Sequence, residues 1–199
     1  LKEFLNRYAG IPAVNIGSGI EGIPSVIADV EAGMAKLMHH LVHDHGYRRI
    51  AMIRGLQYHY DSELRYKVYR KLLDQYEIPF REDLVVAVDP VNNGGRVAVA
   101  KLDKQCGLDC DVITVVGDQM VVRVVKALQE KNYRIPEDVR VVGLQGVSDG
   151  QFFDPPLTIV DDNVYIQGKV GLENLLRLIR GESVPMIQAE PTELVIRRS

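Results

Sequence analysis

The stretch DVITVVGDQMVVRVVKALQEKNYRIPEDVRVVG, residues 111–143, decides the fold. It opens with an apolar run at 112–116 and closes with a second run at 139–142. Between the runs, Met120, Val124 and Leu128 recur at the spacing of one helix face. A strand, a covering helix and a second strand in this order are typical of two parallel strands joined by a helical crossover.

The same alternation extends over the rest of the chain. Short apolar segments predict further strands within 11–17, 25–30, 48–55, 83–89, 155–160 and 191–199. Amphipathic segments between them predict helices, including one at 31–45 that ends before Gly46 and one at 167–180 that ends before Gly181. In the last helix we expect four apolar side chains to point inward: Leu172, Leu175, Leu176 and Ile179.

Continuous apolar strands alternating with helices predict a doubly wound α/β protein, with parallel sheets covered on both faces. Ligands of such folds bind outside the carboxyl ends of the strands, at the point where the strand order reverses. The loops that qualify here begin at Gly17, Gly55, Asp89, Gly117 and Gly143.

Composition limits the classes of function. The 199 residues carry a net charge of −3, and no basic cluster stands out, so we expect this chain alone to bind DNA or RNA poorly. No apolar run is long enough to span a bilayer and no signal peptide is visible, which makes a cytoplasmic protein the expectation. Because the chain begins with Leu1, we expect its true N-terminus to lie elsewhere.

Cofactor and metal motifs are weak. The segment GSGIEG, which begins at Gly17, matches a dinucleotide fingerprint, but Ile23-Pro24 and a strand-like run follow where a helix should open. In HHLVHDH, His39, His40 and His43 fall on the polar side of the helix, and a solvated face is the favoured interpretation. We therefore predict no cofactor, no metal and no enzymatic activity.

The segment GLQYHYDSELR, residues 55–65, is the strongest local candidate for a ligand site. It places Tyr58, His59 and Asp61 at a strand end, just before the helix that carries Arg65. The planar guanidinium of arginine suits carboxylate, phosphate or diol oxygens. A surface Arg65 paired with Asp61 explains the pattern equally well, so the sequence leaves both interpretations open.

Several of these segments, in this order, resemble the effector-binding domain of LacI-type transcription regulators, which shares the type I fold of the periplasmic sugar-binding proteins. They are IPAVNIG, the run from SVIADV to AMIRG, ELRYKVYRKLLDQYEIP, the opening stretch extended to GLQG, DPPLTIVDDNVYIQGKVGLENLLRLIRGE and TELVIRRS. The resemblance covers nearly the whole chain, and IPEDVRVVG followed by PPLT is its most specific part.

The resemblance implies two α/β lobes with a small molecule between them. Residues 25–153 and 188–199 correspond to the C-terminal lobe, and 1–24 with 154–181 to part of the N-terminal lobe. The family's DNA-binding head and the first units of the N-terminal lobe have no counterpart in this sequence. A lobe without those units would expose apolar helix faces and a sheet edge. We therefore predict either a fragment of a longer protein or a tightly self-associating chain.

The resemblance also assigns site residues. Arg65 matches the ligand-gripping arginine of the family, and Asp118 its usual aspartate. Gly17, Gly117 and Gln145 stand where an acid, an asparagine and an aspartate are usual. Glutamine carries no charge and glycine has no side chain, so a monosaccharide held in the family's usual way is not expected. The predicted ligand-binding residues are Arg65, Asp61, Tyr58, His59, Gly117, Asp118, Gln145 and Gly17.

The function that follows is a non-enzymatic sensor domain. It would bind an unidentified small-molecule effector and form a homodimer, with no membrane contact and with DNA bound only through a region outside this chain. Two alternatives stay open from the sequence: the sensor half of a histidine kinase or diguanylate cyclase hybrid, and a dimerising interaction module that has lost its ligand.

Overall fold

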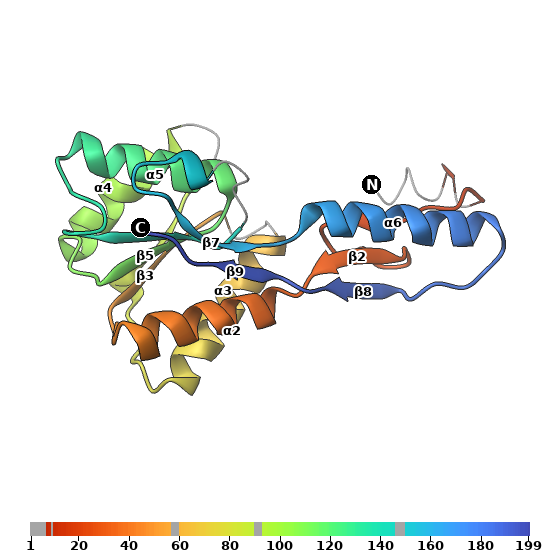
Figure 1. The fold of residues 1–199 in the computed structure, drawn as a ribbon, viewed down its shortest axis with the longest axis horizontal. Helices are drawn as coiled ribbons and strands as arrows, with labels where there is room; N and C mark the ends of the chain where they lie inside the picture. Colours follow the sequence, from red (N-terminus) through yellow and green to blue (C-terminus); the bar gives the residue numbers. More distant parts are fainter. Residues whose placement is uncertain (1–6, 9, 57–59, 90–92, 146–149) are drawn as a thin grey trace. The chain divides into compact units, whose positions relative to one another are not determined.

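The chain folds into two compact units in the computed structural model, which describes residues 7–8, 10–56, 60–89, 93–145 and 150–199. Unit 1 comprises Leu1–Asp29 and Asn163–Pro191, and unit 2 comprises Val30–Asp162 and Thr192–Ser199 (Figure 1). The chain therefore passes between the units at three places, after Asp29, Asp162 and Pro191.

Unit 2 is built on a six-stranded sheet that is parallel except at one edge. Its first five strands in spatial order run parallel, and the last one pairs antiparallel with its neighbour. The spatial order is β4 (Val85–Ala87), β3 (Ile50–Arg54), β5 (Val112–Val115), β6 (Arg140–Gly143), β7 (Thr158–Asp161) and β9 (Glu193–Val195).

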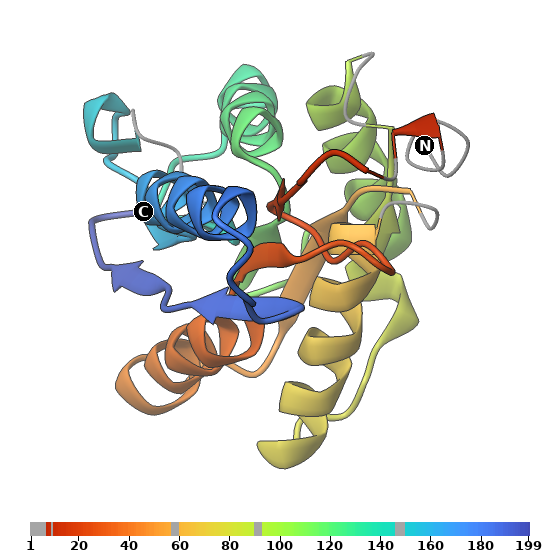
Figure 2. The same ribbon diagram turned by 90° about the vertical axis from the view of Figure 1, so that its right-hand side faces the viewer.

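Helices cover both faces of this sheet. Figures 1 and 2 show α2 (Val30–His39) beside α3 (Tyr60–Gln75) on one face, and Figure 1 shows α4 (Gly94–Cys106) with α5 (Asp118–Glu130) on the other. A π-helical turn, η1 (His40–Asp44), continues α2, and short 3-10 turns lie at Glu82–Leu84 and Gly150–Phe152. The predicted doubly wound α/β architecture is confirmed.

Burial explains why the apolar runs form the central strands. All five residues of β3 and all four of β5 are buried, as expected for a parallel sheet with helices on both faces. Helix α5 contributes Met120, Val124 and Leu128 to the same core, as its spacing predicted. Gly46 follows the helical segment formed by α2 and η1, and its φ of +71° is a backbone conformation that glycine adopts without strain.

Unit 1 contains a smaller, three-stranded sheet and one helix. The parallel strands lie in the order β1 (Asn15–Ile16), β2 (Ser25–Ala28) and β8 (Ile187–Glu190), and α6 (Val164–Ile179) lies along the sheet (Figure 1). The helix approaches β1 closely, since a Cβ atom added to Gly171 would lie 2.7 Å from the side chain of Ile16.

The predicted inward face of α6 is wrong. Leu172, Leu176 and Ile179 are 57%, 43% and 61% exposed, and Leu175 is half-buried. The helix instead buries Gln167, Gly171 and Asn174. Small and polar residues let α6 approach its sheet closely, so that the longer apolar side chains lie outside that contact.

The unit boundaries differ from the predicted lobes because of strand pairing. Strand β2, expected in the C-terminal lobe, pairs with β1 and β8 and so belongs to unit 1. Strand β7, expected in the N-terminal lobe, pairs with β6 and β9 and belongs to unit 2. Among the described residues, no helix is long and apolar enough to cross a membrane.

Candidate functional site

The reversal of strand order in unit 2 lies between β3 and β5. From β3 the chain continues through α3 to β4 on one side, and then through α4 to β5 on the other. In open α/β sheets, ligands bind at such a reversal, outside the carboxyl ends of the two strands. The candidate site is therefore built from the ends of β3, β5, β6 and β7.

Gly117, Asp118 and Gln145 lie at this edge, as predicted. Gly117 precedes α5 with φ +97°, which L-residues with a side chain rarely adopt. Asp118 is exposed, and its carboxylate accepts a hydrogen bond of 2.6 Å from the backbone N–H of Gln119. Gln145 follows β6 and is half-buried, and an amide side chain can both donate and accept hydrogen bonds.

Arg65 is the most deeply buried charged residue described, with an exposed fraction of 0%. Its Nε donates to Asp61 Oδ2 at 3.1 Å, and its Nη2 donates to Asp162 Oδ2 at 2.7 Å. Its Nη1 is buried and has no hydrogen-bond partner among the described residues. The interpretation of Arg65 as a surface residue is wrong, although the predicted contact with Asp61 is present.

Asp162 is a candidate site residue that the sequence analysis missed. It is 4% exposed and follows β7 directly, at the point where the chain leaves unit 2. Burial raises the pKa of its carboxyl group to about 6, while the charge of Arg65 acts in the opposite direction. The acidic pair in TIVDDN, at a strand end, was the only sequence signal for this residue.

Arg54 is a second missed residue, at the carboxyl end of β3. Its guanidinium is ion-paired with Glu63 and lies over the ring of Tyr66, 4.3 Å from the ring centre. Only 3% of Arg54 is exposed, which is rare for a charged residue at the end of a strand unless it is paired. Two buried arginines, each with an acidic partner on α3, thus border the same edge of the sheet.

The remaining predicted residues are separate from this cluster. Gly17 belongs to unit 1, where it follows β1 with φ +96°. The strand β2, and no helix, comes after the glycine-rich segment, which removes the basis for a dinucleotide site there. Tyr58 and His59 lie outside the described residues. Across the part of the chain that is described, no three His, Cys, Asp or Glu residues form a metal-binding group.

The two-unit α/β fold, with polar residues at the strand ends, is that of a periplasmic-binding-protein-like domain. Residues 39–199 match the model of the periplasmic binding protein-like domain family, and the chain belongs to that family. Its relatives identify the domain further as the effector-binding domain of a LacI-type regulator, which confirms the predicted resemblance.

Curated relatives and solved structures agree on this assignment. The ribose operon repressor of Halalkalibacterium halodurans is 29% identical over 201 residues, which cover 100% of this chain and 58% of the repressor. The repressor MelR of Bacillus subtilis is 24% identical, again over 100% of this chain and 59% of its own length. This chain therefore spans little more than half the length of these relatives.

Among solved structures, CcpA of Lactococcus lactis superposes with a TM-score of 0.88 at 25% identity, over 100% of this chain and 72% of its own. The regulator CelR, solved as its cellobiose complex, superposes with a TM-score of 0.87 at 29% identity, over 100% of this chain and 62% of its own. Both of these proteins are transcription regulators.

Proposed function

We propose that this chain is the sensing part of a transcription regulator and that Arg65, Asp61 and Asp162 hold a small polar effector from the side of unit 2. The observation that carries the proposal is the buried Nη1 of Arg65, which has no partner among the described residues. A buried donor without an acceptor costs about 1–3 kcal/mol. A ligand oxygen placed at this atom would remove that penalty and so be bound preferentially.

The effector class follows from the donors and acceptors at the strand ends. Arg65 offers a guanidinium N–H, Asp118 an exposed carboxylate, and Gln145 an amide. A compound with several hydroxyl or carboxylate oxygens fits this set. The cellobiose complex of CelR supports a carbohydrate. The uncharged residues Gly17, Gly117 and Gln145 favour a ligand other than a conventionally held monosaccharide.

Signalling would proceed without chemistry on the ligand, so we propose a non-enzymatic domain. A ligand changes the conformation of such a domain only to the extent that it binds one conformation more tightly than another. In this proposal the protein is a cytoplasmic homodimer, and its DNA contacts come from a region outside this chain. The net charge of −3 supports that division of roles.

A second candidate is an interaction module that has kept the fold and lost the ligand. Its support is the absence of carboxylates at Gly17, Gly117 and Gln145. The kinase and cyclase hybrids receive no such support, because the relatives described above are transcription regulators.

Thermal unfolding of the full-length protein with sugars, purines, amino acids and nucleotides tests the proposal. An effector present at 100 times its Kd stabilises the folded state by about 2.7 kcal/mol and raises Tm. If no compound raises Tm while a stable dimer persists, the interaction module becomes the better explanation.

A double variant separates ligand binding from structure. Arg65→Met or Asp162→Asn alone disrupts a buried charge pair, and loss of one partner of such a pair lowers stability by about 3–5 kcal/mol. The double variant Arg65→Met/Asp162→Asn removes both charges, and we expect it to fold but not to respond to the effector. Lys67→Met, an exposed residue on the same helix, is the matched control. A normal response of the double variant would limit Arg65 to a structural role.

A further inference from the structure

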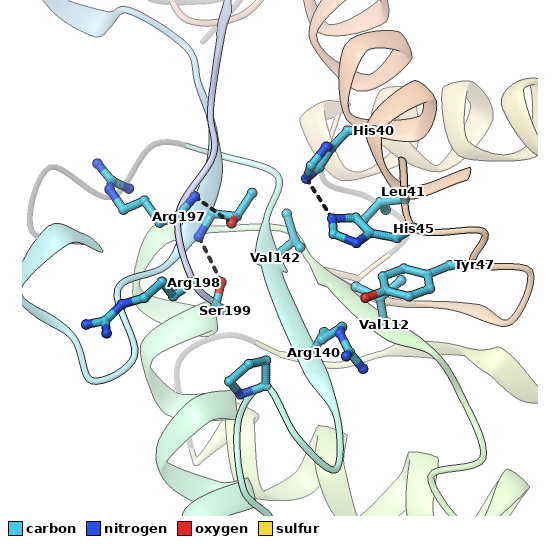
Figure 3. Close-up of a pocket in the computed structure, with 12 residues that line it drawn as sticks. His40, Leu41, His45, Tyr47, Val112, Arg140, Val142, Arg197, Arg198 and Ser199 are labelled. Atoms are coloured by element: carbon cyan, nitrogen blue, oxygen red, sulfur yellow. Dashed lines mark hydrogen bonds between the residues drawn. The ribbon is translucent and has the colours of Figure 1, made fainter. Parts of the chain in front are cut away.

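A cavity lined by both polar and apolar side chains lies at the opposite edge of the unit 2 sheet. Its volume is about 240 Å³. Its lining includes the first residues of three strands, Val112 of β5, Arg140 of β6 and Thr158 of β7. Because parallel strands begin at one edge and end at the other, this cavity is distinct from the candidate effector site. Figure 3 shows His40, His45, Tyr47 and Arg140 on one side of Val142, and Ser199 on the other.

Two histidines of this cavity face each other. The Nε2 atoms of His40 and His45 are 3.2 Å apart, and the Nδ1 of His40 is 2.7 Å from Asp44 Oδ2. The side chain of His40 is only 12% exposed, so its assignment to a solvated face is wrong. The π-helical turn η1 places these groups, and such turns are frequent at functional sites.

Arg140 brings a permanent positive charge to the same wall. It is half-buried at the first position of β6, and its guanidinium lies over Tyr47, 5.2 Å from the ring centre. The ring of Tyr47 stacks on His45 at 5.0 Å, with 14° between the ring planes. Several exposed arginines of unit 2 have a carboxylate partner, whereas none is found for Arg140 among the described residues.

The charges on the cavity wall are therefore unbalanced. No aspartate or glutamate is among the residues that line the cavity. The nearby Asp44 contacts His40 only at its Nδ1 atom. The side chains of Arg197 and Arg198 extend away from the histidines in Figure 3, which leaves Arg140 as the cation nearest to them. Both ring nitrogens of His40 have partners, Asp44 Oδ2 and His45 Nε2. The guanidinium of Arg140 and the Nδ1 of His45 are therefore the N–H groups that can donate to a tetrahedral oxyanion.

We propose that this cavity is an anion site that binds a small oxyanion of the phosphate class, free or as an ester, between Arg140 and the pair His40–His45. The proposal does not depend on the effector site of the proposed function.

Protonation should accompany binding. Burial and the positive charges of His40 and Arg140 lower the pKa of His45, while Asp44 raises it. The groups that bear on the pair are His40, Asp44 and His45, with Tyr47 and Arg140 beside them and the segment 197–199 across the cavity. An anion offsets the repulsion between a protonated His45 and Arg140, so we expect it to bind more tightly as the pH falls and His45 takes up a proton.

Calorimetric titration of the full chain with sulfate, at constant ionic strength, tests the site. Sulfate is chosen because its charge does not change between pH 6 and pH 8. We expect saturable binding that is at least tenfold tighter at pH 6 than at pH 8. Arg140→Gln should weaken it at least tenfold, and His45→Gln should remove most of its pH dependence. Methyl phosphate and inorganic phosphate, titrated alongside, distinguish an ester site from a site for the free anion.

Matched controls separate a built site from general surface charge. Lys104→Gln removes one exposed positive charge from α4, and His43→Gln removes a histidine of η1 that does not line the cavity. Neither should change the affinity for sulfate. The proposal is overturned by absence of saturable binding, by equal weakening in Lys104→Gln, or by unchanged affinity in a folded Arg140→Gln variant. Histidine NMR signals provide a second readout, and only those of His40 and His45 should move.

Discussion

Helix α5 in unit 2 and helix α6 in unit 1 both carry apolar residues at helical spacing, yet they bury different kinds of residue. The first buries six residues, all apolar: Met120, Val121, Val124, Val125, Ala127 and Leu128. The second buries Gln167, Gly171 and Asn174 and exposes leucines and an isoleucine. Helical spacing therefore identifies an apolar face, but the surface opposite the helix decides whether that face is covered.

The sheets explain the difference. Unit 2 offers α5 a six-stranded sheet and a neighbouring helix, α4, with which it packs. Unit 1 offers α6 three strands, and Asn174 there donates a hydrogen bond of 3.0 Å to Gln188 of β8. A narrow sheet covers a narrow stripe of a helix, so most apolar side chains of α6 remain outside it.

The largest expected contrast comes from truncating a leucine in each helix. Leu128→Ala removes a side chain that is 0% exposed, and a core truncation of this kind lowers the free energy of unfolding by about 2–5 kcal/mol. Leu176→Ala, at 43% exposure, should change it by less than about 0.5 kcal/mol. Hydrogen exchange of the amides in each helix measures both effects. Equal losses would mean that another surface buries Leu176 in solution.

A pH titration should affect unit 2 more than unit 1. The pKa of Asp162 is raised to about 6, so its folded form binds a proton that the unfolded form has released. The resulting stabilisation is fully present below about pH 4 and is lost as the pH rises through 6, by about 3 kcal/mol at most. Exchange of α5 amides, compared between the wild type and Asp162→Asn, measures this contribution. If the wild type instead gains stability with pH relative to the variant, the ion pair with Arg65 outweighs burial.

The smallest contrast compares one substitution at two helical glycines. A Cβ atom at Gly95 of α4 would lie 2.4 Å from the backbone carbon of Arg123 in α5, so Gly95→Ala must push the two helices apart, at about 1–3 kcal/mol. At Gly171 the nearest atom belongs to the side chain of Ile16, which is 49% exposed and can move. Alanine also favours helix by about 1 kcal/mol over glycine.

We therefore expect Gly171→Ala to be close to neutral in urea unfolding, while Gly95→Ala shifts the midpoint clearly. A loss at Gly171 as large as that at Gly95 would show that α6 is held as rigidly against its sheet as α4 is against α5.

The sequence predicted the candidate site only in part. Gly117 and Gln145 were assigned to the carboxyl edge because each follows an apolar strand, and the structure places them there. Asp162 was missed because its partner Arg65 is 97 positions away, and no local pattern reports such a pair. Arg54 was missed because a charged residue at a strand end is expected to be exposed to solvent. In the structure, Glu63 and Tyr66 cover its guanidinium.

The amino-acid sequence by itself determined the alternation of strands and helices, the parallel sheet of unit 2, and the strand ends that form the candidate site. Those features follow from local periodicity, since each strand or helix shows its own buried face in its own residues. Tertiary structure alone decided which strands belong to which unit, which face of α6 is covered, and which charges meet. These features depend on contacts between segments that are distant in the sequence, such as Arg65 with Asp162 and Arg140 with His45. The residues of one segment alone do not show which distant segment it will contact.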